Sequence, residues 1–362
     1  MSYRALLLAD LHLSNSLPYA KRFREGSLLT DRLEEIIEGV IRVCRQAESK
    51  GIRDVWFPGD LVDRKVMDGV LLDQLSKLLT WISRDLGMMI FIVPGNHETQ
   101  DRRCTYSIVD GLWRLDRGAI TILDRDEHEG VWAFRYQPNA QLAEDLKIIK
   151  DDSSVVLHQT VKGATIGAWR SSLGFDPKFL ERLFVVAGHF HFAQPLPPPA
   201  RGFYLGAAIQ HDFDDAEDDR AGSIVEFNPG QAPQIVERLS LGCSRFTNLT
   251  FPAEEAEQIL SVPMKTRYMK ITVAGTKASL EGLGKLQRAA EARAKEAGVM
   301  LIWRSKLFIA PKPRLAPEPS PRKTFSWEQT VSGYLAQVQA SELEGLDLDR
   351  ISTLALEALE DR

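Results

Sequence analysis

The sequence of 362 residues has few cysteines and no long apolar run. Cys44, Cys104 and Cys243 are far apart and odd in number, so they predict neither a disulfide framework nor a thiolate metal site. No apolar run reaches the roughly 18 residues that a membrane span needs. The first ten residues, MSYRALLLAD, lack the small-residue cleavage site of a signal peptide. We therefore expect a cytoplasmic protein with no membrane partner.

Charge is distributed unevenly along the chain, although the net charge is only -5. Residues 264–314 hold 12 Lys and Arg against 3 Asp and Glu, which gives +9. Residues 342–362 hold 7 acidic and 2 basic residues, which gives -5. Such polarity predicts different partners for the two segments.

Short apolar runs alternate with helical patterns in the first half of the chain. The runs are rich in Val, Ile, Leu and Phe, as in strands buried on both faces, and they occupy residues 3–10, 54–60, 88–96, 153–159 and 183–191. Helices are predicted over 28–49 and 68–86. This alternation favours a layered α/β domain, in which the loops at the carboxyl ends of the strands form the binding crevice.

The second half of the chain predicts more strands and then a new unit. Residues 201–209, 222–229 and 234–241 are expected to complete a second sheet. A small β-α-β domain starts near residue 246, with a helix over 278–297 between strand-like segments. Five prolines in 311–322 indicate an extended linker. The predicted domains are therefore 1–245, a basic β-α-β domain at 246–310, a linker at 311–324 and a helical segment at 325–362.

Five of the seven histidines follow predicted strands. They stand in the pieces Asp10-Leu-His12, Gly59-Asp60-Leu-Val-Asp63, Gly95-Asn96-His97-Glu98, His158 and Gly188-His189-Phe-His191. The D-x-H and H-x-H spacings place two side chains on one side of a strand end. Neutral imidazole is a common metal ligand. Two adjacent cations need a bridging anion, for which Asp60 is suitable, and the mixture of O and N donors favours Mn, Fe or Zn over Ca.

This ordered set resembles the calcineurin-like metallophosphoesterase superfamily over roughly the first 240 residues. The resemblance implies a β-sandwich flanked by helices. It also implies that one ion is held by Asp10, His12, Asp60 and His191, and the other by Asp60, Asn96, His158 and His189. His97 would be the catalytic residue, which protonates or stabilises the leaving oxygen of the phosphate.

Four further residues near these motifs have open roles. Asp63 could orient a metal ligand and Glu98 could orient His97, or either could be a solvated loop charge. His128 lies in an acidic loop and is expected to be exposed. His211 could approach the site or be an ordinary loop residue.

The spelling DLHLS near the start and LGAAIQHDFDDAEDDRAG after the last His pair are similar to SbcD-type DNA-repair nucleases, bacterial or phage. This resemblance implies a Mn2+-dependent exonuclease on double-stranded DNA and endonuclease on single-stranded DNA, active in repair and recombination. It implies a capping domain at 246–310, an SbcC-like coiled-coil ATPase bound through 325–362, and a homodimer formed through 67–86 or 102–116.

Basic residues of the capping domain are the candidate DNA contacts. They are Lys265, Arg267, Lys270, Lys277, Lys285, Arg288, Arg293, Lys295, Arg304 and Lys306. The alternative is a solvated helix face. Likewise, the apolar stripe that begins at Trp327 could fold back on its own domain instead of binding an ATPase. A second possible function is a phosphodiesterase or phosphatase acting alone on a small substrate. The complete set of metal-binding side chains argues against a third, a non-catalytic scaffold.

Overall fold

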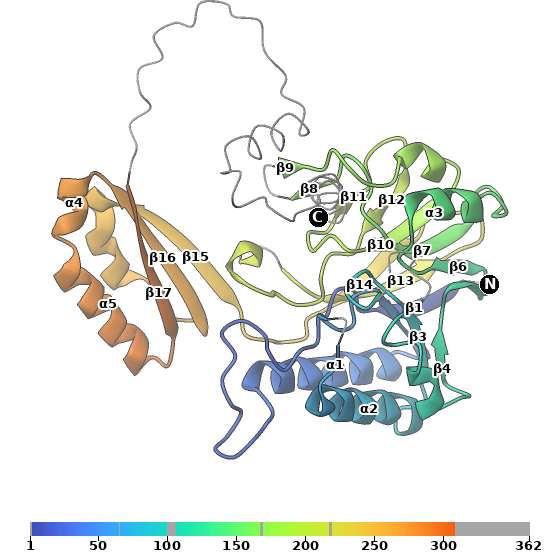
Figure 1. Cartoon of the computed structure of the whole chain (residues 1–362), viewed down its shortest axis with the longest axis horizontal. Coiled ribbons are helices and arrows are strands. Elements are labelled where there is room, and N and C mark those ends of the chain that lie inside the picture. The colour runs from blue at the N-terminus through green and yellow to red at the C-terminus, as the bar shows by residue number, and fades with distance from the viewer. Residues whose placement is uncertain (1, 65, 100–105, 167–168, 217–218, 308–362) are drawn as a thin grey trace, which may run out of the picture. The chain divides into compact units, whose positions relative to one another are not determined.

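The structure is a computed structural model that describes residues 2–64, 66–99, 106–166, 169–216 and 219–307 (Figure 1). The predicted linker at 311–324 and the predicted helical segment at 325–362 lie outside the described residues. The described part belongs to one compact unit, Met1–Phe308. Within it, no helix is long and apolar enough to cross a membrane.

Two six-stranded sheets form a sandwich, which confirms the predicted α/β fold class. The first has the order β14-β13-β1-β2-β3-β4. Its strands are β1 (Tyr3–Leu7), β2 (Asp54–Pro58), β3 (Met89–Val93), β4 (Ile120–Ile122), β13 (Gly222–Phe227) and β14 (Gln234–Leu239). The second has the order β11-β12-β10-β7-β6-β5. Its strands are β5 (Arg125–His128), β6 (Val131–Phe134), β7 (Ser154–His158), β10 (Phe184–Gly188), β11 (Gln194–Pro195) and β12 (Arg201–Tyr204).

The strands are apolar on both sides because each sheet is covered on both faces. Between the sheets, Leu7 and Trp56 of the first pack with Val156 and Val186 of the second. The outer face of the first sheet packs on α1 (Asp31–Ser49) and α2 (Gly69–Arg84), which lie side by side in Figure 1. The outer face of the second sheet packs on α3 (Asn139–Leu146). The resulting helix–sheet–sheet–helix layering buries the apolar stripe of each helix.

Smaller elements complete this part of the chain. They are the two-stranded sheet β8 (Thr165–Ile166) and β9 (Trp169–Arg170), and the 3-10 helices η1 (Leu112–Leu115), η2 (Pro177–Leu180) and η3 (Phe213–Asp215).

The prediction that the segments after residue 201 complete a second sheet is wrong for two of them. Only β12 joins the second sheet, parallel to β10. Strands β13 and β14 extend the first sheet instead, because β13 pairs antiparallel with the free side of β1, with Tyr3 opposite Phe227. The apolar pattern of a strand indicates that the strand is buried, but it does not indicate which sheet the strand will join.

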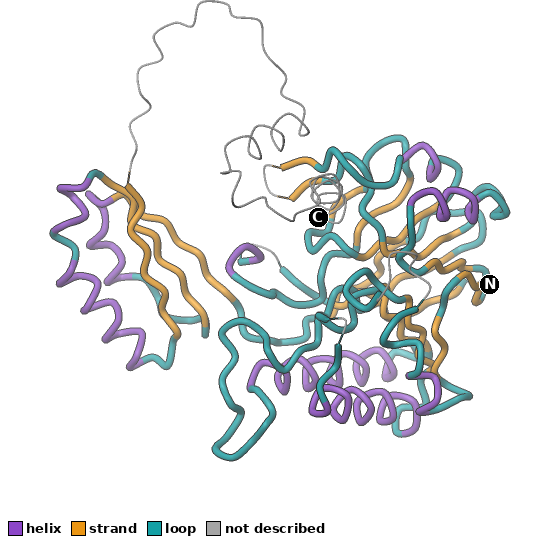
Figure 2. Tube along the Cα trace, viewed as in Figure 1, coloured by secondary structure: helices purple, strands orange, loops and turns teal. Residues whose placement is uncertain are grey.

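The predicted capping domain, called the capping domain below, is a three-stranded parallel sheet covered on one face by helices (Figure 2). Its strands are β15 (Phe246–Pro252), β16 (Tyr268–Gly275) and β17 (Met300–Leu307), and the 3-10 helix η4 (Ala253–Ser261) follows β15. The single helix predicted over 278–297 is wrong. It divides into α4 (Lys277–Glu281) and α5 (Gly284–Glu296), because Gly282 and Gly284 favour an interruption.

The expectation that His128 is exposed is also wrong. It lies on β5, where its ring centroid is 4.1 Å from that of Phe91. Its Nε2 lies 2.9 Å from Oδ2 of Asp54, which also accepts the hydroxyl of Tyr3 at 2.7 Å. This polar cluster links the two sheets at the amino end of β2, away from the predicted site.

Cys44 and Cys243 are free thiols, and burial raises the pKa of each to about 12. At pH 8 each therefore carries more than about 1,000-fold less thiolate than an ordinary thiol. In a Cys104→Ser variant, we expect Ellman's reagent to modify almost no thiol in the native protein and two thiols in urea. Rapid stoichiometric modification of the native variant would contradict the burial of Cys44 and the partial burial of Cys243.

Candidate metal centre

The predicted ligands lie at or just beyond the carboxyl ends of β1, β2, β3, β7 and β10, where both parallel sets of strands end. Four of these ligands have left-handed backbone conformations: Asp10 (φ 51°), His12 (φ 45°), Asp60 (φ 50°) and His189 (φ 91°). Such conformations cost on the order of 1–3 kcal/mol for a residue with a side chain and persist only where the surroundings hold them. Their concentration in one place marks this end of the sandwich as functional.

Glycine is required beside these ligands because the loops approach one another closely. A Cβ on Gly95 would lie 2.2 Å from Oδ1 of Asp60, and a Cβ on Gly188 would lie 2.2 Å from the carbonyl oxygen of Pro58. Any larger residue would push the loops apart, so the two glycines allow the ligands to converge.

The first cluster contains Asp10, His12, Asp60 and His191. The Nε2 atoms of His12 and His191 are 3.2 Å apart. Oδ2 of Asp60 lies 3.6 Å from Nε2 of His12. One donor atom each from Asp10, His12 and Asp60 lie within 4.8 Å of one another. The structure therefore brings together all four residues predicted for the first ion.

The second cluster shares Asp60 and adds Asn96, His158 and His189. Nε2 of His158 lies 3.2 Å from Oδ2 of Asp60 and 3.0 Å from Oδ1 of Asn96. Nδ1 of His189 lies 2.9 Å from the same Asn96 oxygen and 3.2 Å from Nε2 of His158. Asp60 thus stands between the two clusters, where a bridging carboxylate is needed.

These donor sets fit two divalent cations. Nitrogen ligands that lie about 2.1 Å from one ion and at right angles are about 3.0 Å apart. In each cluster two imidazole nitrogens face each other at 3.2 Å. Two such nitrogens cannot both present lone pairs to each other without a proton or a cation between them. The separation therefore suits a shared cation in each cluster.

The outer ring nitrogens of three histidines have partners that fix the inner nitrogens toward the clusters. Nδ1 of His158 lies 3.0 Å from the carbonyl oxygen of Pro58, and Nε2 of His189 lies 2.6 Å from the hydroxyl of Thr160. Nδ1 of His191 lies 3.7 Å from Oδ2 of Asp215. Such outer contacts set the tautomer and the ring orientation of a metal-ligating histidine.

Thr160 and Asp215 were not identified from the sequence. Thr160 stands two residues after His158, so the alternation of side chains could have suggested it. Asp215 lies in an acidic run with no pattern that separates it from its neighbours.

The electric field at the site attracts positive charge. Burial alone would lower the pKa of His158, but Asp60 and Asp10 outweigh it and raise that pKa to about 9. Burial and the neighbouring His158 lower the pKa of His189 to about 3. Protonation at one position and its suppression at the next are expected where carboxylates and imidazoles converge on cation sites, because a bound metal displaces such protons.

His97 differs from the predicted ligands because it stands at the rim. Its side chain is 39% exposed, whereas that of His158 is fully buried. Its Nδ1 donates to the carbonyl oxygen of Asp63 at 2.7 Å, and its backbone N–H donates to Oδ1 of Asp60 at 3.1 Å. Burial would lower the pKa of His97, but the two aspartates raise it to about 9. An imidazole that can carry a proton and reach solvent is suited to act as a general acid.

Asp63 and Glu98 occupy different positions. The carboxylate of Asp63 lies 3.5 Å from Nδ1 of His12 and from Nδ1 of His97. The carboxylate of Glu98 is buried and accepts the backbone N–H groups of Val62 and Gly95. Asp63 therefore contacts a predicted ligand directly, whereas Glu98 joins the backbones of two site loops rather than contacting His97.

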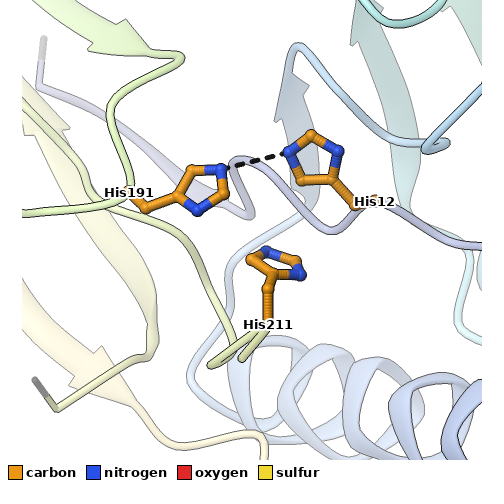
Figure 3. Close-up of side chains that lie close together, drawn as sticks. All are labelled: His12, His191 and His211. Carbon is orange, nitrogen blue, oxygen red and sulfur yellow. Dashed lines mark hydrogen bonds between the residues drawn. The ribbon is translucent and has the colours of Figure 1, made fainter. Parts of the chain in front are cut away.

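His211, whose role the sequence left open, lies against the first cluster (Figure 3). Its ring centroid is 4.8 Å from that of His12 and 4.7 Å from that of His191. Its Nε2 donates to the carbonyl oxygen of Asp10 at 2.8 Å. His211 is therefore in contact with a predicted metal ligand.

The candidate DNA-contacting Lys and Arg residues of the capping domain differ in exposure and in their contacts. Seven of the ten are exposed: Lys265, Lys277, Lys285, Arg288, Lys295, Arg304 and Lys306. Arg267 pairs with Asp31, and the ammonium of Lys270 lies 5.2 Å from the ring centroid of Phe213. The seven exposed basic residues are thus better placed for an external phosphate.

Comparisons with known proteins relate this geometry to a family. A family model described as "Calcineurin-like phosphoesterase" matches residues 3–193, more than half of the chain. The protein named "Putative phosphoesterase 244L" of Invertebrate iridescent virus 6 is 27% identical over 267 residues, which are 69% of this chain and 92% of the viral protein.

Similar solved structures have low scores. The nuclease MPE of Pseudomonas putida is 13% identical, with a TM-score of 0.30 over 61% of this chain and 83% of that one. A dimetal phosphatase from Danio rerio is 11% identical, with a TM-score of 0.39 over 65% of this chain and 98% of that one.

Proposed function

Because the chain belongs to the calcineurin-like phosphoesterase family and is a metal-dependent phosphoesterase, we propose that its substrate is the phosphodiester backbone of DNA. In this proposal it is an SbcD-type nuclease of DNA repair and recombination, an exonuclease on double strands and an endonuclease on single strands. The observation that supports this substrate is the +9 charge of residues 264–314, with seven exposed basic residues on a domain joined to the phosphoesterase sandwich.

We assign the metal ligands from the two clusters. Asp10, His12, Asp60 and His191 hold one ion, and Asp60, Asn96, His158 and His189 hold the other. Mn2+ is the proposed metal because the resemblance to SbcD-type nucleases implies it, and the mixture of carboxylate and amide oxygen with imidazole nitrogen is compatible with Mn, Fe or Zn. When bound, two such ions activate a water nucleophile and neutralise charge on the phosphate.

The remaining groups act on the substrate or on the ligands. His97 lies at the solvent-exposed rim and holds a proton that it can deliver to the leaving oxygen. Asp63 orients His12 and His97, and Thr160 and Asp215 orient His189 and His191. Together these contacts keep the imidazoles in one tautomer before the phosphate arrives.

The direct test is hydrolysis of linear duplex DNA and of a small diester, bis-p-nitrophenyl phosphate, with Mn2+ present and after removal of metal by a chelator. We expect Mn2+-dependent cleavage of both substrates. If the protein hydrolyses only the small diester at every Mn2+ concentration, the alternative of a small-molecule phosphodiesterase or phosphatase replaces the nuclease.

Charge reversal on the capping domain should affect DNA and not the small diester. Lys285 and Arg288 are exposed on α5, so the double Lys285→Glu/Arg288→Glu variant should bind DNA more weakly. The slope of log affinity against log salt should fall by about 0.9 for each lost phosphate contact.

The matched control changes Lys147 and Lys178, two exposed lysines of the phosphoesterase domain, to Glu. Its DNA affinity should stay closer to that of the wild type. Equal losses in the two double variants would show that the capping domain has no special role in binding DNA.

Partners are part of the same proposal. An SbcC-like coiled-coil ATPase binds through residues 325–362, which lie outside the described residues. A homodimer forms through 67–86 or 102–116, where Leu72 is 44% exposed and Trp113 is 37% exposed.

A further inference from the structure

Arg32 is a buried charge near the amino end of α1, with only 3% of its surface exposed. Its guanidinium donates to three backbone carbonyls. Nη1 donates to Pro18 at 3.0 Å and to His211 at 2.9 Å, and Nη2 donates to Gln210 at 3.0 Å. A planar guanidinium holds such a set of acceptors in a fixed geometry. Arg32 therefore fixes the backbone of residues 210 and 211.

The face of the same guanidinium contacts the capping domain. The carbon at its centre lies 4.9 Å from the ring centroid of Phe246 on β15 and 5.6 Å from that of Tyr268 on β16. These two rings form an apolar cluster with Phe213. In addition, Oε1 of Gln210 accepts the backbone N–H of Phe246 at 2.8 Å. The segment at 210–211 is thus tied to the first capping strand both directly and through Arg32.

The same segment reaches the metal centre on its other side. Nε2 of His211 donates to the carbonyl oxygen of Asp10 at 2.8 Å, and the His211 ring lies beneath His12 and His191 (Figure 3). Asp10 has a left-handed backbone, and its carboxylate accepts the backbone N–H of His189 at 2.9 Å. Since a strained conformation lasts only while its surroundings hold it, the His211 contact helps to fix the Asp10 carboxylate.

We propose that Arg32 and His211 are positioning residues that couple the docking of the capping domain to the affinity of the metal position containing Asp10. The path runs from Phe246 and Tyr268 through Arg32 to the 210–211 backbone, and from His211 to Asp10. The coupling is reciprocal: metal binding tightens the docking of the capping domain, and a ligand that displaces β15 weakens metal binding. The inference rests on the two-metal site proposed above and does not depend on the substrate being DNA.

The test measures Mn2+ binding by calorimetry, without nucleic acid, in the full-length chain. His211→Phe keeps a ring beside His12 and His191 but removes the donor to Asp10. Arg32→Met keeps an apolar side chain over Phe246 but removes the carbonyl contacts. In each variant we expect one of the two Mn2+ sites to weaken by about 10- to 100-fold, as when groups that orient a ligand are lost. The other site should keep its affinity.

A matched control separates this effect from general destabilisation. Arg42 lies on the same helix and donates to the carbonyl of Leu241. Arg42→Met should bind two Mn2+ ions as the wild type does. The Arg32→Met/His211→Phe double variant should lose no more Mn2+ affinity than the single variant with the larger loss, because both substitutions act on one path.

The possible results separate failure of the two-metal premise from failure of the proposed coupling. If the wild type binds fewer than two Mn2+ ions, the two-metal premise fails. If it binds two and Arg32→Met or His211→Phe keeps both affinities, the coupling is overturned. Should Arg32→Met not fold, Tyr268→Leu removes a ring that the guanidinium covers and must weaken the same site. Co2+ substitution adds a spectroscopic check. The variants should need a higher Co2+ concentration than the wild type to reach full intensity of the visible band, but the band should have the same position at saturation.

Discussion

Asp60→Asn is expected to lower the rate of phosphodiester hydrolysis by at least three orders of magnitude, about 4 kcal/mol of transition-state stabilisation. The reason is its position between the two clusters. One carboxylate oxygen lies 3.6 Å from Nε2 of His12 and 3.2 Å from Nε2 of His158. An amide has nearly the same shape but no charge to bridge two cations, so both positions should be affected by one substitution.

Metal stoichiometry distinguishes this prediction from simple loss of a catalytic group. At a Mn2+ concentration that saturates the wild type, the Asp60→Asn variant should retain at most one ion. The matched control is Asp145→Asn, which neutralises another buried carboxylate, one that pairs with Arg125 outside the site. That variant should retain two ions and near wild-type hydrolysis. Two ions bound with unchanged affinity in Asp60→Asn would contradict the bridging position.

The strand ends were the part of the site that the sequence predicted best. The apolar runs before Asp10, Asp60 and Asn96 stop where polar residues begin, and β1, β2 and β3 end within three residues of them. Parallel strands place their carboxyl ends at one edge. The convergence of these side chains can therefore be predicted from the pattern alone. The resemblance to a family depended only on the order of these motifs along the chain.

Residues that enter the site through tertiary packing could not be predicted in this way. His211 lies in a loop that follows β12 with no strand directly before it, and its contact with Asp10 joins residues 201 positions apart. Asp215 contacts His191 through the same loop. The path of that loop is set by Arg32 and the aromatic cluster at Phe246, which no local pattern connects with it. The assignment of β13 and β14 to a sheet failed for the same reason, because pairing partners are not encoded locally.

His97→Ala should reduce cleavage of DNA by about 100- to 10,000-fold, the usual contribution of a general acid. Two Mn2+ ions should still bind, because His97 lies at the rim and is outside both ligand sets. Its ring Nδ1 donates to the Asp63 carbonyl at 2.7 Å and its backbone N–H donates to Asp60 Oδ1 at 3.1 Å, so these contacts hold His97 in place without making it a ligand in either cluster.

The leaving group provides the sharper measurement. A DNA sugar oxygen needs a proton when it departs, whereas p-nitrophenolate leaves readily without one. His97→Ala should therefore affect bis-p-nitrophenyl phosphate by at least about tenfold less than DNA, as expected when proton transfer to the leaving oxygen is the lost step. His128→Ala is the matched control, since its imidazole binds Asp54 at the opposite end of the strands. Equal losses on both substrates would instead place His97 in phosphate binding, because that contact is the same whichever group leaves.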